Sequence, residues 1–326
     1  MSVAQGSFDG MTEMRFKSPT AALRIAAEDL SASQQAVAAL NLNGIATVYG
    51  APGTGKTTAI KALFSNAMKS LKPSQILVLA ANRESANALR DELALGFQGA
   101  TPGPLARTLT SFAFSILRLK ALREGQALPE LISGSEQDRI LAQVIADVVA
   151  DGLPPVSDEW PAQFNQQVIE LSGFRAELRD LITVCLEHGL NVEEMKGLAA
   201  KHGKPEWAAS ALFFERYLAT VSAFEGRFDA SSLLRIASQW LASQSEWPAE
   251  LREIQTVIVD DAQELTPAAM RLLRAVTGTT RGLILVGDPD SSTLGFRAAD
   301  PRAMAALAGA LAADRGSEVE TIFLES

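Results

Sequence analysis

The stretch VYGAPGTGKTTAI, residues 48–60, constrains the fold more than any other part of the chain. It holds the pattern Gly-x-x-x-x-Gly-Lys-Thr from Gly50 to Thr57, after an apolar strand-like run and before a helical pattern over 56–71. In that setting the pattern predicts a phosphate-binding loop. Its glycines let successive backbone N–H groups point inward around a phosphate, at a helix N-terminus that already favours anions. The chain must therefore provide a strand that ends where this loop begins.

Each part of the loop has an expected role in binding a nucleotide. Lys56 should reach the β- and γ-phosphates as a point charge, and the hydroxyl of Thr57 should bind magnesium. The alternative, a glycine-rich turn with an exposed lysine, fits the strand-before and helix-after context less well. We expect the cofactors to be ATP and Mg²⁺, and the nucleotide to contact Gly50, Ala51, Pro52, Gly53, Thr54, Gly55, Lys56, Thr57 and Thr58.

Strand-like runs recur along the chain and predict a parallel sheet. Most are continuously apolar rather than alternating, which is typical of strands covered on both faces. Helical patterns at 56–71, 83–95 and 267–276 lie between them, an alternation that predicts an α/β, doubly wound domain. The expected strands are 45–50, 75–81, 107–112, 256–261, 283–288 and 319–324.

Two carboxylates, Asp260 and Asp261, directly follow the apolar run TVIV. Two like charges at the end of a buried strand are costly unless a positive group lies beside them. Mg–ATP on the phosphate loop would supply that group, with Asp260 holding the water shell of the metal and Asp261 orienting or deprotonating the attacking water. The alternative is a pair of acids that cap the next helix.

The middle of the chain differs from both ends. From 119 to 250 the pattern is helical, with a helix start expected at Ser135, a cap at Asp229 and no convincing strand. The simplest architecture is one α/β domain interrupted by an all-helical insert. We expect a loosely held leader at 1–29, the α/β domain in two parts at 30–118 and 251–326, and the insert at 119–250.

Composition excludes several classes of protein. Since the 326 residues include one cysteine, Cys185, neither an internal disulfide nor a cysteine metal cluster is possible. No apolar run approaches the roughly 20 residues needed to span a bilayer, and the start lacks a secretory signal pattern. We expect a cytoplasmic protein with no membrane partner. The net charge of −9 neither supports nor excludes a nucleic-acid partner.

Five further segments appear in an order that resembles a known family. They are LSASQ (30–34), LAANRESA (79–86), TLTSFAFSILR (108–118), DDAQE (260–264) and VGDPDSSTLGFRAAD (286–300). With the phosphate loop, they resemble the N-terminal motor half of superfamily-one DNA helicases of the UvrD/Rep/PcrA type, and the AdnA/AdnB-like branch is one candidate for the nearest group. The resemblance covers nearly all of the chain after residue 29.

The resemblance implies a P-loop RecA-like sheet with helices on both faces, and movement in the 3′-to-5′ direction along single-stranded DNA. The substrate would be single-stranded DNA or a 3′-tailed duplex, in a DNA-repair setting, and a helicase or nuclease subunit could be a partner. Gln34 would read the adenine edge. The resemblance places DNA contacts at Asn82, Arg83, Thr110, Phe112, Phe296 and Arg297.

Departures from the family pattern keep alternatives open. Asp261 stands where the family has Glu, Ser291 replaces a Gln that senses the γ-phosphate, and Thr110 replaces His; Ala80 and Leu294 replace aromatic residues. A degenerate, non-catalytic nucleotide- or DNA-binding motor subunit and an AAA-type P-loop ATPase are the alternatives for function.

Core packing is the alternative role for Phe112 and Phe296. The chain also ends in VETIFLES, before any arginine that would complete an ATP site in these helicases. We therefore expect a fragment that lacks the second RecA-like domain and is nearly inactive alone.

Overall fold

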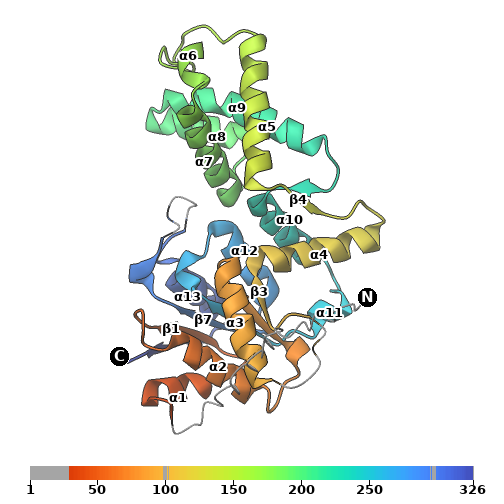
Figure 1. Ribbon diagram of the computed structural model, residues 1–326, viewed down its shortest axis with the longest axis vertical. Coiled ribbons are helices and arrows are strands. Elements are labelled where there is room, and N and C mark those ends of the chain that lie inside the picture. The colour runs from red at the N-terminus through yellow and green to blue at the C-terminus, as the bar shows by residue number, and fades with distance from the viewer. Residues whose placement is uncertain (1–28, 98–100, 102, 294, 296–298, 326) are drawn as a thin grey trace, which may run out of the picture.

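The computed structural model describes residues 29–97, 101, 103–293, 295 and 299–325 (Figure 1). The expected leader, apart from residue 29, lies outside the described residues, as do Leu294, Phe296 and Arg297. In the described part, no helix has the length and apolar character that crossing a membrane requires.

A six-stranded sheet forms the base of the molecule (Figure 1). All of its strand pairs are parallel, and the spatial order is β3-β2-β6-β7-β1-β8. The α/β fold with helices around a parallel sheet, predicted from the alternation of patterns, is therefore confirmed. The strands are β1 (Ile45–Tyr49), β2 (Ile76–Ala80), β3 (Ala106–Thr108), β6 (Thr256–Asp260), β7 (Gly282–Gly287) and β8 (Val319–Phe323).

Helices cover both faces of the sheet, so that β2, β6 and β7 are buried at every position. Alternate strand residues such as Val48 and Ile258 point into one core, which is closed by α1 (Ala32–Ala38), α2 (Lys56–Ala67) and α3 (Arg83–Gly96). Their neighbours, such as Val257 and Leu285, point into the other core. That second core is closed by α4 (Leu109–Glu124), α10 (Ala230–Ser243), α11 (Ala249–Arg252), α12 (Pro267–Thr277) and α13 (Ala303–Arg315).

The expected strand at 107–112 is wrong for most of its length. β3 ends at Thr108, where the Thr108 hydroxyl accepts a hydrogen bond from the Ser111 N–H (3.0 Å) and starts α4. A threonine cap thus outweighs the strand preference of the β-branched and aromatic residues around it.

Five helices form a separate group at the end of the molecule far from the sheet (Figure 1). They are α5 (Gly134–Ala150), α6 (Gln166–Ile169), α7 (Ser172–His188), α8 (Val192–His202) and α9 (Pro205–Ser222). The cap of α5 is Ser133, which accepts from the Glu136 N–H (3.2 Å), rather than Ser135 as expected. The predicted cap at Asp229 is confirmed, since it accepts from the Ser232 N–H (2.9 Å).

A short parallel pair of strands, β4 (Glu130–Leu131) and β5 (Arg227–Phe228), joins the two ends of this helical group. The expectation of no strand between 119 and 250 missed them, because two residues are too few to show a periodic pattern. The expected boundary at 118 falls inside α4, and α10 belongs to the core of the sheet domain, where it packs mainly against α4 and α12. The stretch 119–250 therefore contributes to two different cores.

Glu187, at the end of α7, links the distal helices to the sheet domain. Its carboxylate is buried and accepts hydrogen bonds from the Ser231 hydroxyl (2.6 Å) and from the Ala268 N–H (3.1 Å). Ser231 opens α10 and Ala268 lies in the first turn of α12, where unpaired N–H groups favour an anion. The Glu187 carbonyl also accepts from Arg271. One buried acid therefore ties together three helices from the two cores.

We expect Glu187→Ala to lower the free energy of unfolding by about 2–3 kcal/mol, because two charge-assisted hydrogen bonds are lost and the first turn of α12 loses an N–H partner. Urea unfolding followed by circular dichroism measures this difference.

Glu177→Ala is the matched control, since Glu177 is exposed on the same helix. That variant should stay within about 0.5 kcal/mol of the wild type. A Glu187→Ala protein as stable as the Glu177→Ala protein would show that the link contributes nothing to stability.

Candidate active site

The sequence motifs meet at one edge of the sheet. Since all strands are parallel, their carboxyl ends lie together, which is where ligands bind in open α/β sheets. The phosphate loop follows β1 and the two acids lie at the end of β6; Asn82 follows β2, Asp288 follows β7, and α4 begins after β3. Gly50 and Asp288, which are 238 positions apart in sequence, are thus brought to a common edge by the topology alone.

The phosphate loop has a conformation that only glycine adopts easily. Gly53 and Gly55 have φ of +88° and +83°, and a Cβ on Gly55 would lie 2.3 Å from the Gln34 Nε2. The loop begins with a hydrogen bond from the Gly50 N–H to the Gly287 carbonyl (3.1 Å), which joins it to β7. The N-terminus of α2 and the loop backbone therefore form a cradle without side chains at the positions where a phosphate would approach.

Lys56 lies across the cradle. Its Nζ donates to the carbonyls of Gly50 (2.9 Å) and Ala51 (3.3 Å), so the ammonium group is held at the loop. Gln34 supports the loop from the other side, where its Nε2 donates to the Thr54 carbonyl (3.2 Å) and its Oε1 accepts from the Ser31 N–H (3.1 Å). The side chain of Gln34 thus lies beside the loop, and its contact with adenine stays a prediction.

Asp260 is a buried carboxylate at the end of β6, 8% exposed. Burial raises its pKa to about 6, and the charge of Asp261 adds to this rise. The Asp261 N–H, which donates to the Asp260 Oδ1 (3.0 Å), and the charge of Lys56 oppose it. Among the described residues no ion pair neutralises Asp260. The surroundings of the Asp260 carboxylate therefore favour binding of either a proton or a cation.

Asp261 has the only positive φ (+52°) among the described residues that are not glycine. Its carboxylate accepts from the Ser85 hydroxyl (2.9 Å) and, more distantly, from the Gln263 Nε2 (3.4 Å). It makes no capping bond to the short turn that follows, and Thr266 caps α12 instead. The helix-capping alternative for the two acids therefore does not describe this geometry.

Two residues at this edge had no role in the sequence-based prediction. Gln263 is buried between the ends of β6 and β7; its Oε1 accepts from the Asp288 N–H (3.0 Å), and a Cβ on Gly287 would lie only 2.5 Å from that oxygen. Ser85 lies in the quoted segment LAANRESA, yet its spacing gave no sign of a contact with Asp261. Both interactions depend on which strands become neighbours.

The predicted DNA contacts differ in their surroundings. Asn82 and Arg83 are exposed at the start of α3, where Asn82 caps the helix by accepting from the Ser85 N–H (2.9 Å). Thr110 is half-buried in the first turn of α4. Phe112 is 0% exposed and lies in the core beneath the sheet, with the Arg107 guanidinium 4.9 Å from its ring centre.

A base could not stack on Phe112 without opening that core, so the structure corrects this expected contact in favour of core packing. The predicted contacts at Phe296 and Arg297 lie outside the described residues.

Ser291, which replaces the glutamine expected to sense the γ-phosphate, makes a local turn. Both its N–H and its hydroxyl donate to the Asp288 carbonyl (3.1 Å each). Two arginines near the chain end, Arg302 and Arg315, bind other groups: Arg302 pairs with Asp300, and Arg315 donates to carbonyls at the end of α12.

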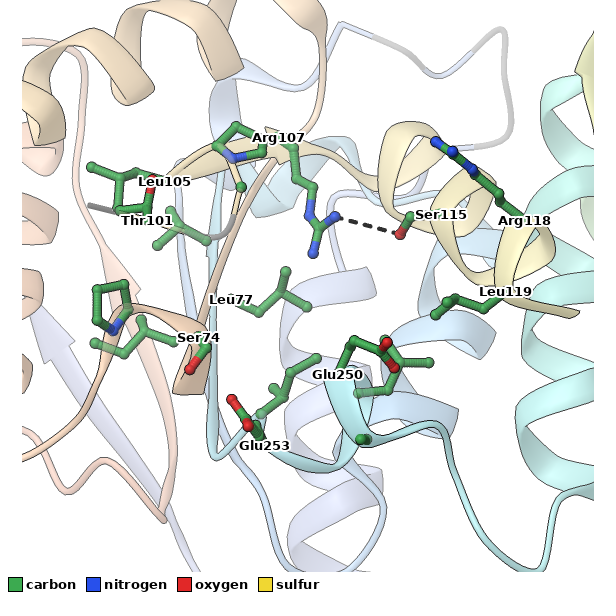
Figure 2. Close-up of a pocket in the computed structure, with 18 of the residues that line it drawn as sticks. Ser74, Leu77, Thr101, Leu105, Arg107, Ser115, Arg118, Leu119, Glu250 and Glu253 are labelled. Atoms are coloured by element: carbon green, nitrogen blue, oxygen red, sulfur yellow. Dashed lines mark hydrogen bonds between the residues drawn. The ribbon is translucent and has the colours of Figure 1, made fainter. Parts of the chain in front are cut away.

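A separate cavity of about 640 Å³ lies beside the edge strand β3 (Figure 2). It is bounded by the start of β2, the segment before β3, α4 and α11. Arg107 projects into it and donates to the Ser115 hydroxyl (3.4 Å), and burial lowers the pKa of Arg107. None of the predicted site residues lines this cavity, so the candidate active site is the open edge around the phosphate loop.

The residues at the edge fit a nucleotide with magnesium. In the described part no group of three or more His, Cys, Asp or Glu could hold a metal alone. Magnesium needs no such group, because it keeps several waters and binds one or two protein oxygens together with phosphates. The exposed Thr57 and the buried Asp260 offer such oxygens, and a cation would offset the burial and the like charge of Asp261 that raise the pKa of Asp260.

Comparison with known proteins places the chain among helicases. Residues 30–311 match the family model of the UvrD/REP helicase N-terminal domain. A protein named "Probable DNA helicase" from Mycoplasma pneumoniae is 24% identical over 277 residues, which are 83% of this chain and 49% of that protein. A "Probable DNA helicase II homolog" from Mycoplasma capricolum is 21% identical over 276 residues, or 83% of this chain and 36% of that protein. The chain therefore spans about half of one relative and about a third of the other.

The raised pKa of Asp260 predicts a pH-dependent stability. In the unfolded chain the carboxyl has its ordinary pKa near 3.9, whereas in the folded protein it is about 6. The folded state thus binds the proton more tightly, and this contribution to stability is present below about pH 4 and lost as the pH rises through 6. We expect Asp260→Asn, which cannot ionise, to gain about 1–3 kcal/mol of unfolding free energy relative to wild type between pH 4 and pH 7.

Urea unfolding at several pH values, without nucleotide or magnesium, measures the difference between the two proteins. If that difference is the same at pH 4 and pH 7, the carboxyl titrates normally and is not the buried acid described above.

Proposed function

Because the chain belongs to the UvrD/REP helicase N-terminal domain family, a family of ATP-dependent DNA helicases, we propose that it is the ATP-binding motor domain of a 3′-to-5′ translocase on single-stranded DNA. One observation carries the proposal. The phosphate loop, the acids Asp260 and Asp261, and the exposed start of α3 lie at the same edge of one sheet. The proposed phosphate site after β1 and the proposed DNA site after β2 would therefore share one edge, with the ends of β6 and β7 between them.

Residues of the phosphate loop would bind the triphosphate. The backbone N–H groups from Gly53 to Thr57 and the N-terminus of α2 would hold the β-phosphate, and Lys56 would leave its carbonyl partners for the phosphate oxygens. Thr57 and Asp260 would hold magnesium, which when bound neutralises charge that develops on the phosphates. A bound cation would favour the ionised form of Asp260, since an opposite charge nearby lowers the pKa of a carboxyl.

Asp261 would orient the attacking water and accept its proton. An ionised carboxylate has four lone-pair positions, and Ser85 and Gln263 engage two of them. Those that remain can accept a hydrogen bond from water. The side chain is one methylene shorter than the glutamate of the family pattern, and the left-handed backbone at Asp261 directs it differently from an ordinary strand end.

The start of α3 would bind the DNA backbone. Arg83 lies at the first helical position, where the positive end of the helix dipole disfavours a cation. No ion pair joins Arg83 to another described residue. A cation that is exposed, unpaired and at the positive end of a helix is better explained by an external phosphate than by stability of the helix. Thr110, at the start of α4, is the second candidate contact at this edge.

The complete motor would need more than the residues described. Phosphoryl transfer gains about 10³–10⁵ in rate from an arginine placed on the γ-phosphate, and Arg302 and Arg315 are engaged elsewhere. In the family resemblance such arginines come from a second RecA-like domain. The relatives are about two to three times as long as the part that this chain matches. We propose that hydrolysis by this chain alone is slow, and that a partner helicase or nuclease subunit acts with the complete protein.

A non-catalytic motor subunit is the second candidate function. It is favoured by Ser291, whose hydroxyl is used in a local turn and not turned toward a phosphate. An AAA-type ATPase is less consistent with the family match over residues 30–311.

The DNA part of the proposal predicts salt-sensitive binding of a single strand. We expect a fluorescent oligo-dT to bind the protein at low ionic strength, and Arg83→Ala to weaken that binding about 3- to 10-fold, because one phosphate contact is lost. Fluorescence anisotropy over a range of salt concentrations measures the affinity and its slope.

Arg90→Ala is the matched control, since Arg90 lies two turns further along α3 and pairs with Asp91. Its affinity for the oligonucleotide should equal that of the wild type. Equal weakening in both variants would mean that general charge, and not the start of α3, binds DNA; absence of binding to the wild type would contradict a DNA motor.

A further inference from the structure

We infer that Ser85 is a positioning residue for ATP hydrolysis, and that through it the first turn of α3 sets the orientation of the Asp261 carboxylate. This inference rests on the proposed function, because it assigns to Asp261 the role of positioning water. Ser85 lies outside the motif residues to which the sequence gave a role, and its part in the site follows from the observed contact.

The backbone at Asp261 shows that its orientation is maintained by surrounding contacts. A left-handed conformation is unfavourable for an L-residue, although Asp tolerates it better than most residues. Glycine would adopt the same φ of +52° without that cost. An aspartate whose backbone is left-handed needs contacts from neighbouring residues that hold both its backbone and its carboxylate in place.

Those neighbours come from three sides. The Ser85 hydroxyl donates to one carboxylate oxygen of Asp261 at 2.9 Å, and the Gln263 Nε2 approaches the other at 3.4 Å. The Asp261 N–H is held by the Asp260 Oδ1 at 3.0 Å. Because the amide contact of Gln263 is long, the Ser85 hydrogen bond is the stronger of the two that fix the side chain.

Ser85 also connects Asp261 to the proposed DNA contact. Its backbone N–H is bound by the Asn82 side chain at 2.9 Å, so Asn82, Ser85 and Asp261 form a continuous chain of two hydrogen bonds. Ala80 and Asp260 are paired in register across β2 and β6, which places the start of α3 directly beside the two acids. A DNA strand bound at Asn82 and Arg83 would therefore contact the first turn of α3, the same turn from which Ser85 binds the carboxylate of Asp261.

The test measures ATP hydrolysis with a sensitive phosphate-release assay over a range of Mg–ATP concentrations up to saturation, with and without single-stranded oligo-dT. Lys56→Ala supplies the background rate, and Ser65→Ala, an exposed serine on α2, is the matched serine control. We expect Ser85→Ala to lower kcat about 5- to 50-fold while KM for ATP stays within about twofold, because orientation and not nucleotide binding is lost. Ser85→Thr, which keeps the hydroxyl, should restore most of the rate.

A double-mutant comparison separates positioning from a structural effect. Asp261→Asn alone should lower kcat by roughly 100-fold or more, and adding Ser85→Ala to it should lower kcat no further, since the two residues act as a unit. An equal loss from Ser85→Ala in both backgrounds, a change in KM alone, or a wild-type kcat in Ser85→Ala would each overturn the inference. A wild-type protein that hydrolyses no more ATP than Lys56→Ala would instead contradict the proposed function, and this inference with it.

Discussion

The buried carboxylate of Asp260 is the constraint on which the rest of the site depends. It lies at the end of a strand whose every residue is buried, next to a second acid, and the described part of the chain gives it no ion pair. An ionised acid in such a position requires a positive charge nearby or keeps a proton. The parallel sheet supplies the solution by placing the phosphate loop, with Lys56 and the N-terminus of α2, at the same edge. The position of the phosphate loop therefore accounts for a buried acid at the end of β6, and the acid accounts for a cation site beside the loop.

The same physical principle recurs where the helical group meets the sheet domain. Glu187 is also a buried carboxylate, yet here the chain satisfies it internally with the Ser231 hydroxyl and the first turn of α12. The contrast between the two acids is informative. Glu187 has its partners within the protein and serves structure. Among the described residues, Asp260 has only the Asp261 N–H and the charge of Lys56 to favour its ionised form, and is left able to bind a cation.

Local patterns predicted most of the sheet and the phosphate loop, because these depend on apolar runs, glycine spacing and helix caps. The prediction was wrong where one hydroxyl decided the outcome, as at Thr108, whose cap turns an expected strand into α4. It also put Phe112 among the DNA contacts, with core packing as the alternative, and the neighbours that bury this side chain come from elements far apart in the sequence. The bond from Ser85 to Asp261 joins residues 176 positions apart, and only the adjacency of β2 and β6 reveals it.

Isothermal titration calorimetry of ATP binding, with and without magnesium, tests the central claim most directly. The wild-type protein is expected to bind ATP more tightly with magnesium, and Lys56→Ala should lose at least about tenfold in affinity, or about 1.4 kcal/mol. Lys61→Ala, on the same helix but paired with Glu92, should bind like the wild type. Equal affinity of the wild type and Lys56→Ala would contradict the account, because the nucleotide would then lie away from the phosphate loop.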